Sequence, residues 1–456
     1  MNKIGLFRVM KLCKDYVKMG EEERKGVQEK RLRELVQFAR ENSPYYARLY
    51  QGLPDNFTLT DLPPVNKIEL MNCFSEWITD STITLQYVKQ FMEDMDHVGR
   101  KMNGKYLIFT TSGSTGNPLV ALCDTTANNV MGGISATRSF ARKEDMSAFI
   151  RKGRKIIGVF ATSGFYLSNS SVRSRLLAMP WKKKKLAVTS ALLPINQIVE
   201  QLNTFQPTML GGYPSNLELL IDEVKSDRLH ISPVIIMTGG EYLSDSLRER
   251  LSQAFHCYVQ TAYSCTEGGT IACECRERHF HVNEDWVLIE PVDEKNRPVP
   301  DGVRSDKVLL TNFFNYTQPY IRYELTDRVI MHHTPCACGN PSPWLELEGR
   351  TDDVASFWEG CQEIKVAPLA LYAILKEVHE LRRFQIVVKK ENHVEMRIEP
   401  IEGIPREDAF HKAEQALVSF LRTQGIHEVT VTLSEDVPMQ HQRSGKFKHI
   451  INDTGK

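Results

Sequence analysis

The stretch "TTSGSTGNP", at residues 110–118, decides how this chain is interpreted. It holds three threonines, two serines, two glycines, an asparagine and a proline, and no charged residue. Glycines let a ligand approach the backbone closely, and hydroxyl and amide N–H groups are good donors to phosphate. The pattern is neither a Walker A motif nor a G-x-G-x-x-G fingerprint. Taken alone, it fits either a surface turn or a phosphate-binding loop.

The segments around this loop predict an α/β fold. A β-rich run, "KYLIF" (105–109), precedes the loop, and an apolar run, "LVALC" (119–123), follows it. From 106 to 300, short β-rich runs such as "KIIGVFAT" and "VIIMTGG" alternate with helical stretches such as "NQIVEQLNTF" and "SDSLRERLSQAF". Alternating strands and helices are typical of a partly parallel sheet.

The length of the chain, 456 residues, predicts two or three domains. After "EGRTDDV" the pattern changes, and residues 360–456 hold a compact set of strands and helices ("FQIVVKK", "HVEMRIE", "EVTVTL"). About a hundred residues suffice for one small α+β domain. We therefore predict a large multi-sheet α/β domain at 1–349 and a small α+β domain at 350–456.

The composition argues against nucleic acid as the main partner and against a membrane-spanning segment. Lys+Arg and Asp+Glu both count 57, so the formal net charge is zero, whereas a protein that mainly binds nucleic acid normally has a basic field. No apolar run approaches the length of a membrane span. The N-terminal stretch 1–20 interrupts its apolar residues with Arg8, Lys11 and Lys14 and lacks a signal-peptide core. We expect a cytoplasmic protein.

The N-terminal stretch and the lysine run at 181–185 each have two possible interpretations. The N-terminal stretch predicts an amphipathic helix that packs on the protein, with a membrane-surface anchor as the alternative. The run "WKKKK" (181–185) predicts a solvated basic face, since short charge runs usually form one. Its alternative is a clamp for a coenzyme A phosphate or for pyrophosphate.

Ten cysteines without an export signal suggest reduced thiols and perhaps a metal site. "ACECRERHFHV" (272–282) and "PCACG" (335–339) place two Cys-x-Cys pairs and two histidines about fifty-five residues apart. This spacing suits a structural, tetrahedral Zn²⁺ with three thiolates and one imidazole. Our predicted ligands are Cys275, His281, Cys336 and Cys338. Cys273 and His279 remain substitutes, and buried unreactive thiols are the alternative.

Five further motifs accompany the 110–118 loop in a fixed order. They are "TGGE" (238–241), "YSCTEGG" (263–269), "RYELTDR" (322–328), "GRTDD" (349–353) and "RSGK" (443–446). Each motif is weak alone, but together the set resembles the adenylate-forming superfamily of acyl-coenzyme A ligases, adenylation domains and luciferases, over nearly the whole chain. The likeness is greatest to its phenylacetate–coenzyme A ligase branch. The features are "NSPYYARLY" (42–50), Leu119 after Pro118, "YPSN" (213–216), "FHVNEDW" (280–286) and "CACG" (336–339).

The resemblance implies an ATP site, because such enzymes activate a carboxylate by attack on the α-phosphorus of ATP. Catalysis of that step is mainly positioning and neutralisation of two anions. Glu267 would hold Mg²⁺, Thr266 would contact the α-phosphate, and Tyr263 would stack on adenine. The backbone of Gly239, Gly240 and Glu241 would support the adenine. The β- and γ-phosphates would be cradled by Thr111, Ser112, Gly113, Ser114, Thr115 and Gly116.

The resemblance also assigns roles to the second half of the chain. Asp327 would accept both ribose hydroxyls, and Arg350 would reach the ribose too. Asp352 would be the hinge about which a mobile small domain turns. Lys446 would bridge the carboxylate and the α-phosphate as a point charge. A solvated glutamate at 267, a surface Asp-Arg pair at 327 and a solubilising lysine at 446 are the alternatives.

The substrates are less determined than the reaction. Phe165, Tyr166 and Ser264 are candidates for the acid pocket, and the branch implies an aryl or arylacetic acid. Ser264 and Cys265 depart from the branch, which typically has a small pair beginning with glycine there. The stretch 355–368, with Trp358 and Cys361, is also altered, so the acceptor is either coenzyme A or an amine or carrier-protein thiol.

The competing class is a catalytically inactive binding relative. Such a relative would be expected to lose the magnesium glutamate, the ribose aspartate or the terminal lysine. Glu267, Asp327, Arg350 and Lys446 are all present, so an enzyme is favoured. The oligomeric state is left open between a monomer and a homodimer.

Overall fold

The computed structural model describes residues 4–111, 118–350, 355–360, 362–366, 371–372, 374–375, 377–439 and 447–453, without the side chains of 348–350, 362 and 365. The chain divides into two compact units. One holds the chain up to Leu325 together with Ile330–Glu346; the other holds Thr326–Val329 and most of the chain from Leu347 onward. The predicted boundary at 349–350 stays a prediction, because residues 351–354 lie outside the described residues.

A nine-stranded sheet has the strand order β13-β14-β9-β8-β7-β6-β5-β3-β4, and all of it belongs to the larger unit except the start of β13 and the end of β14. Strands β4, β3, β5, β6 and β7 are parallel, whereas β7–β8, β8–β9 and β9–β14 pair in antiparallel fashion. The strand bounds are β3 Ile156–Phe160, β4 Leu186–Ser190, β5 Met209–Gly212, β6 Ile235–Gly239, β7 Tyr258–Cys265, β8 Gly269–Glu274, β9 Phe280–Val282, β13 Asp327–His332 and β14 Trp344–Arg350.

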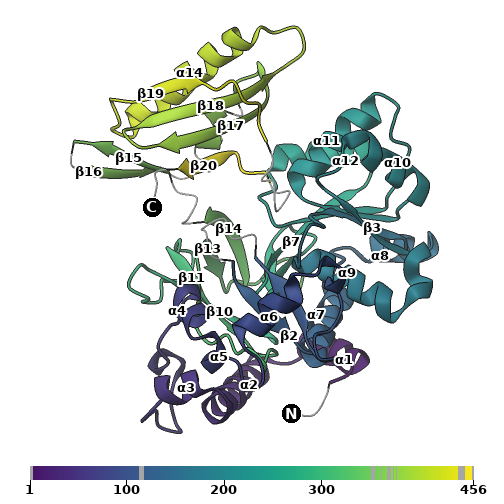
Figure 1. The fold of residues 1–456 in the computed structure, drawn as a ribbon, viewed down its shortest axis with the longest axis vertical. Coiled ribbons are helices and arrows are strands. Elements are labelled where there is room, and N and C mark those ends of the chain that lie inside the picture. Colours follow the sequence, from purple (N-terminus) through teal and green to yellow (C-terminus); the bar gives the residue numbers. More distant parts are fainter. Residues whose placement is uncertain are drawn as a thin grey trace. The chain divides into compact units, whose positions relative to one another are not determined.

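Helices that connect the parallel strands cover this sheet (Figure 1). Ile198 and Leu202 of α10, Leu217 and Leu220 of α11 and Leu251 of α12 are buried in one core with Ile157, Val159, Leu210 and Ile236 of the strands. Phe149 of α8 packs in a second core with Met209 and Ile235. The helix bounds are α7 Thr125–Arg138, α8 Lys143–Arg151, α9 Leu167–Ala178, η3 Pro180–Lys184, α10 Ile195–Phe205, α11 Pro214–Lys225 and α12 Asp245–Phe255. Burial of apolar strand and helix faces is the dominant stabilising term of such an α/β layer.

The rest of the larger unit consists of N-terminal helices and two small antiparallel sheets. The helices are α1 Leu6–Tyr16, α2 Glu21–Asn42, α3 Pro44–Leu49, η1 Leu59–Asp61, α4 Lys67–Asn72, α5 Phe74–Trp77, α6 Leu85–Met92 and η2 Met95–His97. The sheets are β1 Leu107–Thr110 with β2 Val120–Cys123, and β10 Val287–Val292 with β11 Lys307–Asn312 and β12 Tyr323–Leu325. Ser43 begins α3 as its N-cap and Pro44 is its first residue, so "NSPYY" ends one helix and starts the next.

The smaller unit is an α+β fold with the four-stranded sheet β19-β18-β17-β20. Its apolar core joins Ile386, Val388 and Met396 of the sheet to Ala413 and Leu417 of the helix α14. The bounds are β15 Ala355–Glu359, β16 Gln362–Val366, β17 Leu381–Lys389, β18 His393–Pro400, α14 Arg406–Thr423, β19 Thr430–Leu433 and β20 Ile450–Asp453. The predicted fold class, a large α/β unit and a small α+β unit, is confirmed. Among the described residues, no helix is both long enough and apolar enough to cross a bilayer.

Candidate functional site

The carboxyl ends of β6 and β7 bring two of the predicted motifs together. Gly239 pairs with Ala262, so "TGGE" lies beside Tyr263. Gly240 has φ +79°, which L side chains rarely adopt, so a glycine is required at that turn. Ligands of open α/β sheets bind at the carboxyl ends of the strands. The side chain of the half-buried Glu241 contacts α11: its Oε2 accepts a hydrogen bond from the backbone N–H of Ser215 at 3.1 Å.

Glu267 occupies the turn between β7 and β8. Its side chain is 8% exposed, and its Oε1 accepts a hydrogen bond from the Tyr323 hydroxyl at 3.1 Å. Its backbone carbonyl accepts from Asn312 Nδ2 at 2.7 Å, which fixes the turn. Burial, and then the charge of Glu267, raises the pKa of Tyr323, so the phenol stays a donor. Thr266 in the same turn is half-buried, and Ser264 is exposed.

The stem of the 110–118 loop is a β-hairpin closed by hydrogen bonds. Thr110 pairs with Val120, the Thr111 N–H donates to the Leu119 carbonyl at 3.1 Å, and the Leu119 N–H donates to Thr111 Oγ1 at 2.9 Å. Thr111 therefore closes the stem through two hydrogen bonds with Leu119. The other predicted phosphate contacts, Ser112–Gly116, lie outside the described residues.

The candidate acid-pocket residue Phe165 lies next to this stem. Its carbonyl accepts from the Thr110 N–H at 2.8 Å, and its buried ring is 6.4 Å from the ring of Phe91. Phe91 in turn stacks on His97, with 4.2 Å between ring centroids. Sequence reasoning missed Phe91 and His97, because nothing in the sequence links α6 to the segment around Phe165. Tyr166 is half-buried and is the residue that precedes α9.

The predicted ribose and hinge residues are only partly described. Asp327 is the half-buried first residue of β13, and Arg350 is the last residue of β14, without a described side chain. Asp352 and Lys446 lie outside the described residues. Their roles stay predictions.

The four predicted metal ligands meet in one cluster. The donor atoms of Cys275, His281, Cys336 and Cys338 all lie within 4.8 Å of one another. Cys275 Sγ is 3.9 Å from Cys336 Sγ, and Cys338 Sγ is 3.3 Å from His281 Nε2. His281 Nδ1 is 2.8 Å from the Ser342 carbonyl, so Nδ1–H donates and Nε2 faces the thiols as a lone-pair donor. Three sulfurs and one imidazole in this arrangement fit a closed tetrahedral Zn²⁺ site.

Burial shifts the pKa values of three groups in this cluster in the direction that favours their neutral forms. Burial lowers the pKa of His281, which keeps the imidazole neutral, as a ligand must be. Burial raises the pKa of the Cys275 and Cys338 thiols, and a bound divalent cation would reverse that effect. Backbone N–H groups also point at the sulfurs: Asn340 N is 3.3 Å from Cys338 Sγ.

The two substitute ligands have other surroundings. The half-buried Cys273 has a different neighbour: Asn283 Nδ2 lies 3.8 Å from its sulfur. His279 Nδ1 is 3.3 Å from Cys336 Sγ, but its ring stacks on Trp344 with 3.8 Å between centroids. His279 therefore contacts the proposed ligand Cys336, whereas Cys273 contacts Asn283.

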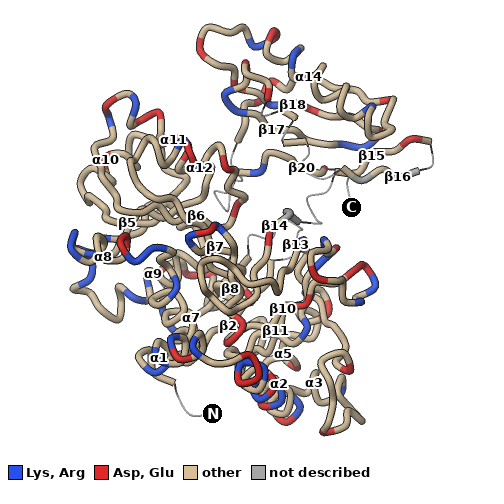
Figure 2. Tube along the Cα trace, turned by 180° about the vertical axis from the view of Figure 1, so that it is seen from behind, with Lys and Arg blue, Asp and Glu red and all other residues tan. Residues whose placement is uncertain are grey.

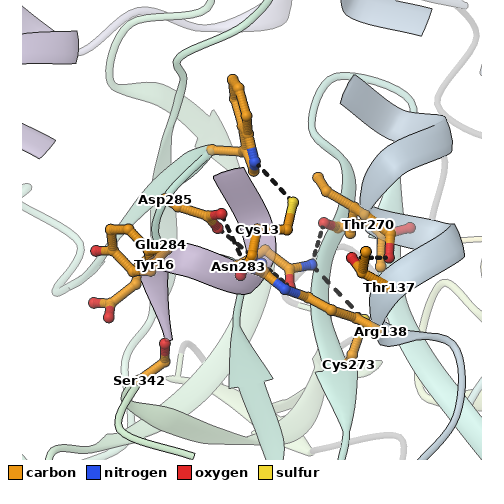
Figure 3. A network of polar contacts seen from close by, with 12 residues as sticks. Cys13, Tyr16, Thr137, Arg138, Thr270, Cys273, Asn283, Glu284, Asp285 and Ser342 are labelled. Carbon is orange, nitrogen blue, oxygen red and sulfur yellow. Dashed lines mark hydrogen bonds and ion pairs between the residues drawn. The ribbon is translucent and has the colours of Figure 1, made fainter. Parts of the chain in front are cut away.

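A network of polar contacts joins the "FHVNEDW" segment to α1 and α7 (Figure 3). Arg138 of α7 makes a bidentate pair with Asp285, at 2.7 and 2.8 Å, and donates to Asn283 Oδ1 at 2.8 Å. Trp286 donates its indole N–H to Cys13 Sγ of α1 at 3.3 Å. The motif "FHVNEDW" thus supplies one residue to the cluster and three to contacts with α1 and α7. Sequence reasoning quoted this motif without finding these partners, which are far away in the chain.

Comparisons with known proteins are consistent with this architecture. No family model matches the sequence. The chain is 23% identical over 411 residues to phenylacetate–coenzyme A ligase of Thermus thermophilus, covering 85% of this chain and 83% of that protein. It is 23% identical over 320 residues to protein CapK of Staphylococcus aureus, covering 66% and 62% of the two chains.

A solved structure shows the same fold. The crystal structure of 2-hydroxyisobutyryl-CoA ligase in the postadenylation state, in complex with 2-HIB-AMP, has a TM-score of 0.70. The similarity covers 95% of this chain and 90% of that chain, at 18% sequence identity. An open conformation of the same ligase, in complex with 2-HIB-AMP and CoA, has a TM-score of 0.57 at 19% identity, over 92% and 91% of the two chains.

Proposed function

Taking the chain as a member of the adenylate-forming superfamily, in its phenylacetate–coenzyme A ligase-like branch, we propose that it activates a carboxylic acid with ATP and transfers the acyl group to coenzyme A. The observation that carries the proposal is the position of Glu267. It is a buried carboxylate in the turn that follows β7, the strand in which Ala262, the residue before Tyr263, pairs with Gly239.

The first half-reaction forms an acyl-adenylate. A carboxylate oxygen attacks the α-phosphorus of ATP, and pyrophosphate leaves. Glu267 would hold Mg²⁺, which neutralises charge on the phosphates, and Tyr263 would bind the adenine ring. Thr266 would donate its hydroxyl to the α-phosphate, and Asp327 would accept from the ribose. The buried surroundings of Glu267 make its charge more effective than it would be in water.

The second half-reaction replaces AMP by a thiol. The adenylate is already activated, so the protein must mainly deliver the acceptor to the acyl carbonyl. We propose that the small domain turns about Asp352 between the two steps and carries Lys446 with it. The lysine bridges carboxylate and α-phosphate only in the first step.

Adenylation is tested by pyrophosphate release with ATP and a panel of carboxylic acids. Lys446→Ala should lose most of the adenylation rate, because it removes the cation between two anions. Lys448→Ala is the matched control: it removes the same charge two residues further on, at an exposed position. If Lys446→Ala adenylates as fast as the parent, the lysine assignment is wrong; if no acid gives pyrophosphate release, the protein is an inactive binding relative.

The acid is proposed to be an aryl or arylacetic acid. Support comes from the aromatic surroundings of the candidate pocket, where Phe165 is buried near Phe91. Tyr166 and Ser264 are the further candidates. Thermal shift with ATP and single acids should rank aryl acids first, and a strong response only to long-chain fatty acids would overturn this assignment.

The acceptor is proposed to be coenzyme A, with an amine or a carrier-protein thiol as the second candidate. The observation that favours the second candidate is the altered stretch 355–368. The identified acid is supplied with ATP and coenzyme A, then with amines, and products are followed by mass spectrometry. Accumulation of adenylate without thioester, at coenzyme A concentrations on the order of millimolar, would exclude coenzyme A and leave adenylation intact.

We also propose that Cys275, His281, Cys336 and Cys338 hold a structural Zn²⁺. Purified protein should contain about one zinc per chain, and Cys336→Ser should lose it and lower the Tm. Cys73→Ser is the control, since it changes a thiol of intermediate burial outside the cluster. Metal analysis without zinc, on protein purified without a chelator, would contradict the assignment.

A further inference from the structure

The charge of this chain is unevenly distributed, although its formal net charge is zero. From Met146 to Val199 there is no Asp or Glu, while the same stretch holds ten Lys and Arg residues. Nine of them form what we call the basic face: Arg151, Lys152, Arg154, Arg173, Arg175 and Lys182–Lys185. All but the half-buried Lys182 are exposed, and Figure 2 shows basic residues gathered along α8 and α9.

Local structure brings the two halves of the basic face together. Residues 151–155 lead into β3 and residues 182–185 lead into β4, and these parallel strands are neighbours with Ile156 opposite Leu186. The Ile156 N–H donates to the Lys185 carbonyl at 2.8 Å. The lysine run and the Arg151–Lys155 segment therefore lie side by side, at the amino ends of the strands.

This position separates the basic face from the nucleotide site. The predicted ATP motifs lie at the carboxyl ends of the parallel strands, such as Gly239 of β6. A strand of five residues such as β3 spans roughly 16 Å. A clamp for pyrophosphate or for the coenzyme A phosphates would be expected at the carboxyl edge, where ligands of such sheets bind. We therefore expect the basic face to bind a partner other than pyrophosphate or coenzyme A.

Large apolar side chains are exposed among these cations. Trp181 is 73% exposed and Leu177 is 51% exposed, on η3 and at the end of α9. The N-terminal helix α1 adds Phe7, which is 84% exposed, and Leu6. The side chains of Leu6 in α1 and Arg175 in α9 both reach Gly132 of α7, within 3.3 and 3.8 Å of the position that a Cβ would take there.

The combination decides which anionic partner fits. A nucleic acid gains from cations but little from exposed aliphatic side chains, whereas a membrane interface gains from both. Tryptophan is enriched at membrane–water interfaces, and basic clusters attract anionic headgroups. We propose that the basic face, with Trp181, Leu177 and Phe7 as its apolar contacts, docks this protein peripherally on an anionic lipid bilayer.

The first test is flotation of the full chain with lipid vesicles. Vesicles with about 30 mol% phosphatidylserine in phosphatidylcholine should carry the protein, and pure phosphatidylcholine vesicles should not, because the attraction requires surface charge. Binding should fall steeply between low salt and physiological salt. Absence of binding to phosphatidylserine vesicles at low salt, or equal binding to both compositions, overturns the proposal.

Two matched pairs of variants locate the surface. Lys182→Gln, Lys183→Gln, Lys184→Gln and Lys185→Gln together should lower the partition coefficient roughly tenfold or more. The control removes four cations elsewhere, with Lys25→Gln, Lys30→Gln, Lys295→Gln and Lys390→Gln, and should retain binding. Trp181→Ala should also weaken binding, whereas Trp358→Ala, which removes a tryptophan that is 49% exposed in the smaller unit, should not.

The remaining outcomes also decide the question. Equal loss in the variant and control of either pair contradicts the assignment of the surface. Tight binding to single- or double-stranded nucleic acid, without vesicle binding, assigns the basic face to a different macromolecule. Pyrophosphate release should be unchanged in the Lys182–Lys185 variant, so failure of this proposal and failure of the adenylation proposal are separable.

Discussion

The β7–β8 hairpin carries two buried glutamates, one in its turn and one at its far end, and the protein surrounds them differently. Glu274 makes a bidentate pair with Arg248 of α12, at 2.7 and 3.0 Å, and accepts from the Thr261 N–H at 3.0 Å. Glu267 accepts a hydrogen bond from the hydroxyl of Tyr323. A guanidinium brings a neutralising charge to a carboxylate, whereas a phenol donates a hydrogen bond and brings no charge.

We propose that Glu274 has a structural role and Glu267 a functional one. Arg248 also donates to the Val259 carbonyl, so the pair with Glu274 fastens α12 to the sheet next to Cys275. For Glu267, the proposed role is that of a Mg²⁺ ligand. The same substitution, glutamate to glutamine, should therefore lower activity at position 267 and lower stability at position 274.

Glu267→Gln is expected to have the largest effect, and it should be on activity. Removing the carboxylate charge should lower the adenylation rate by about a thousandfold, which corresponds to about 4 kcal/mol of transition-state stabilisation. The amide keeps the shape of the side chain, so the Tm should change little. Pyrophosphate release and thermal unfolding measure the two quantities; a large fall in Tm with activity retained would assign Glu267 to structure.

Glu274→Gln should affect stability and leave the chemistry unchanged. It leaves the buried guanidinium of Arg248 without its counter-charge, which costs about 3 kcal/mol in the free energy of unfolding. Denaturant unfolding measures this, and the adenylation rate per folded molecule should stay within about twofold of the parent. Glu346→Gln is the control, because the contact of Glu346 with His332 involves a carboxylate that is 51% exposed. Its loss should cost at most about 0.5 kcal/mol.

Tyr323→Phe should give the smallest effect. It removes one hydrogen bond to Glu267 and should cost about 1 kcal/mol, seen as a roughly fivefold lower adenylation rate. Tyr320→Phe is the matched control: Tyr320 is buried against Tyr323, at 5.3 Å between centroids, and its hydroxyl makes no hydrogen bond to the described residues. Equal effects of the two substitutions would show that the phenol of Tyr323 does not orient Glu267.

The sequence predicted what depends on local pattern. Alternating runs predicted the α/β class, and two short Cys-x-Cys segments predicted the metal cluster, because each ligand pair is close in sequence. The choice between Cys275 and Cys273 could not be made from spacing alone. It depends on the neighbours of each thiol: Cys275 lies near Cys336, and Cys273 lies near Asn283.

What the sequence did not predict depends on partners distant in the chain. The contact of Cys13 with Trp286 joins residues 273 positions apart, and Arg138 is 147 positions from Asp285. Such pairs have no periodicity or spacing that a single sequence reveals. The aromatic contact between Phe91 and Phe165 escaped prediction for the same reason. Burial of Glu274 could not be predicted either, since a charged residue in a strand is usually solvated.

The stretch from 146 to 199, which has no Asp or Glu, affects how charge is distributed in the protein. Because the whole chain has a formal charge of zero, its ten cations are balanced by an equal excess of acidic residues in the rest of the chain. The charge along the chain is therefore uneven, although the net charge is zero. Near its isoelectric point, at pH about 7.2, it should still be retained by a cation-exchange resin, with the basic face turned toward the matrix.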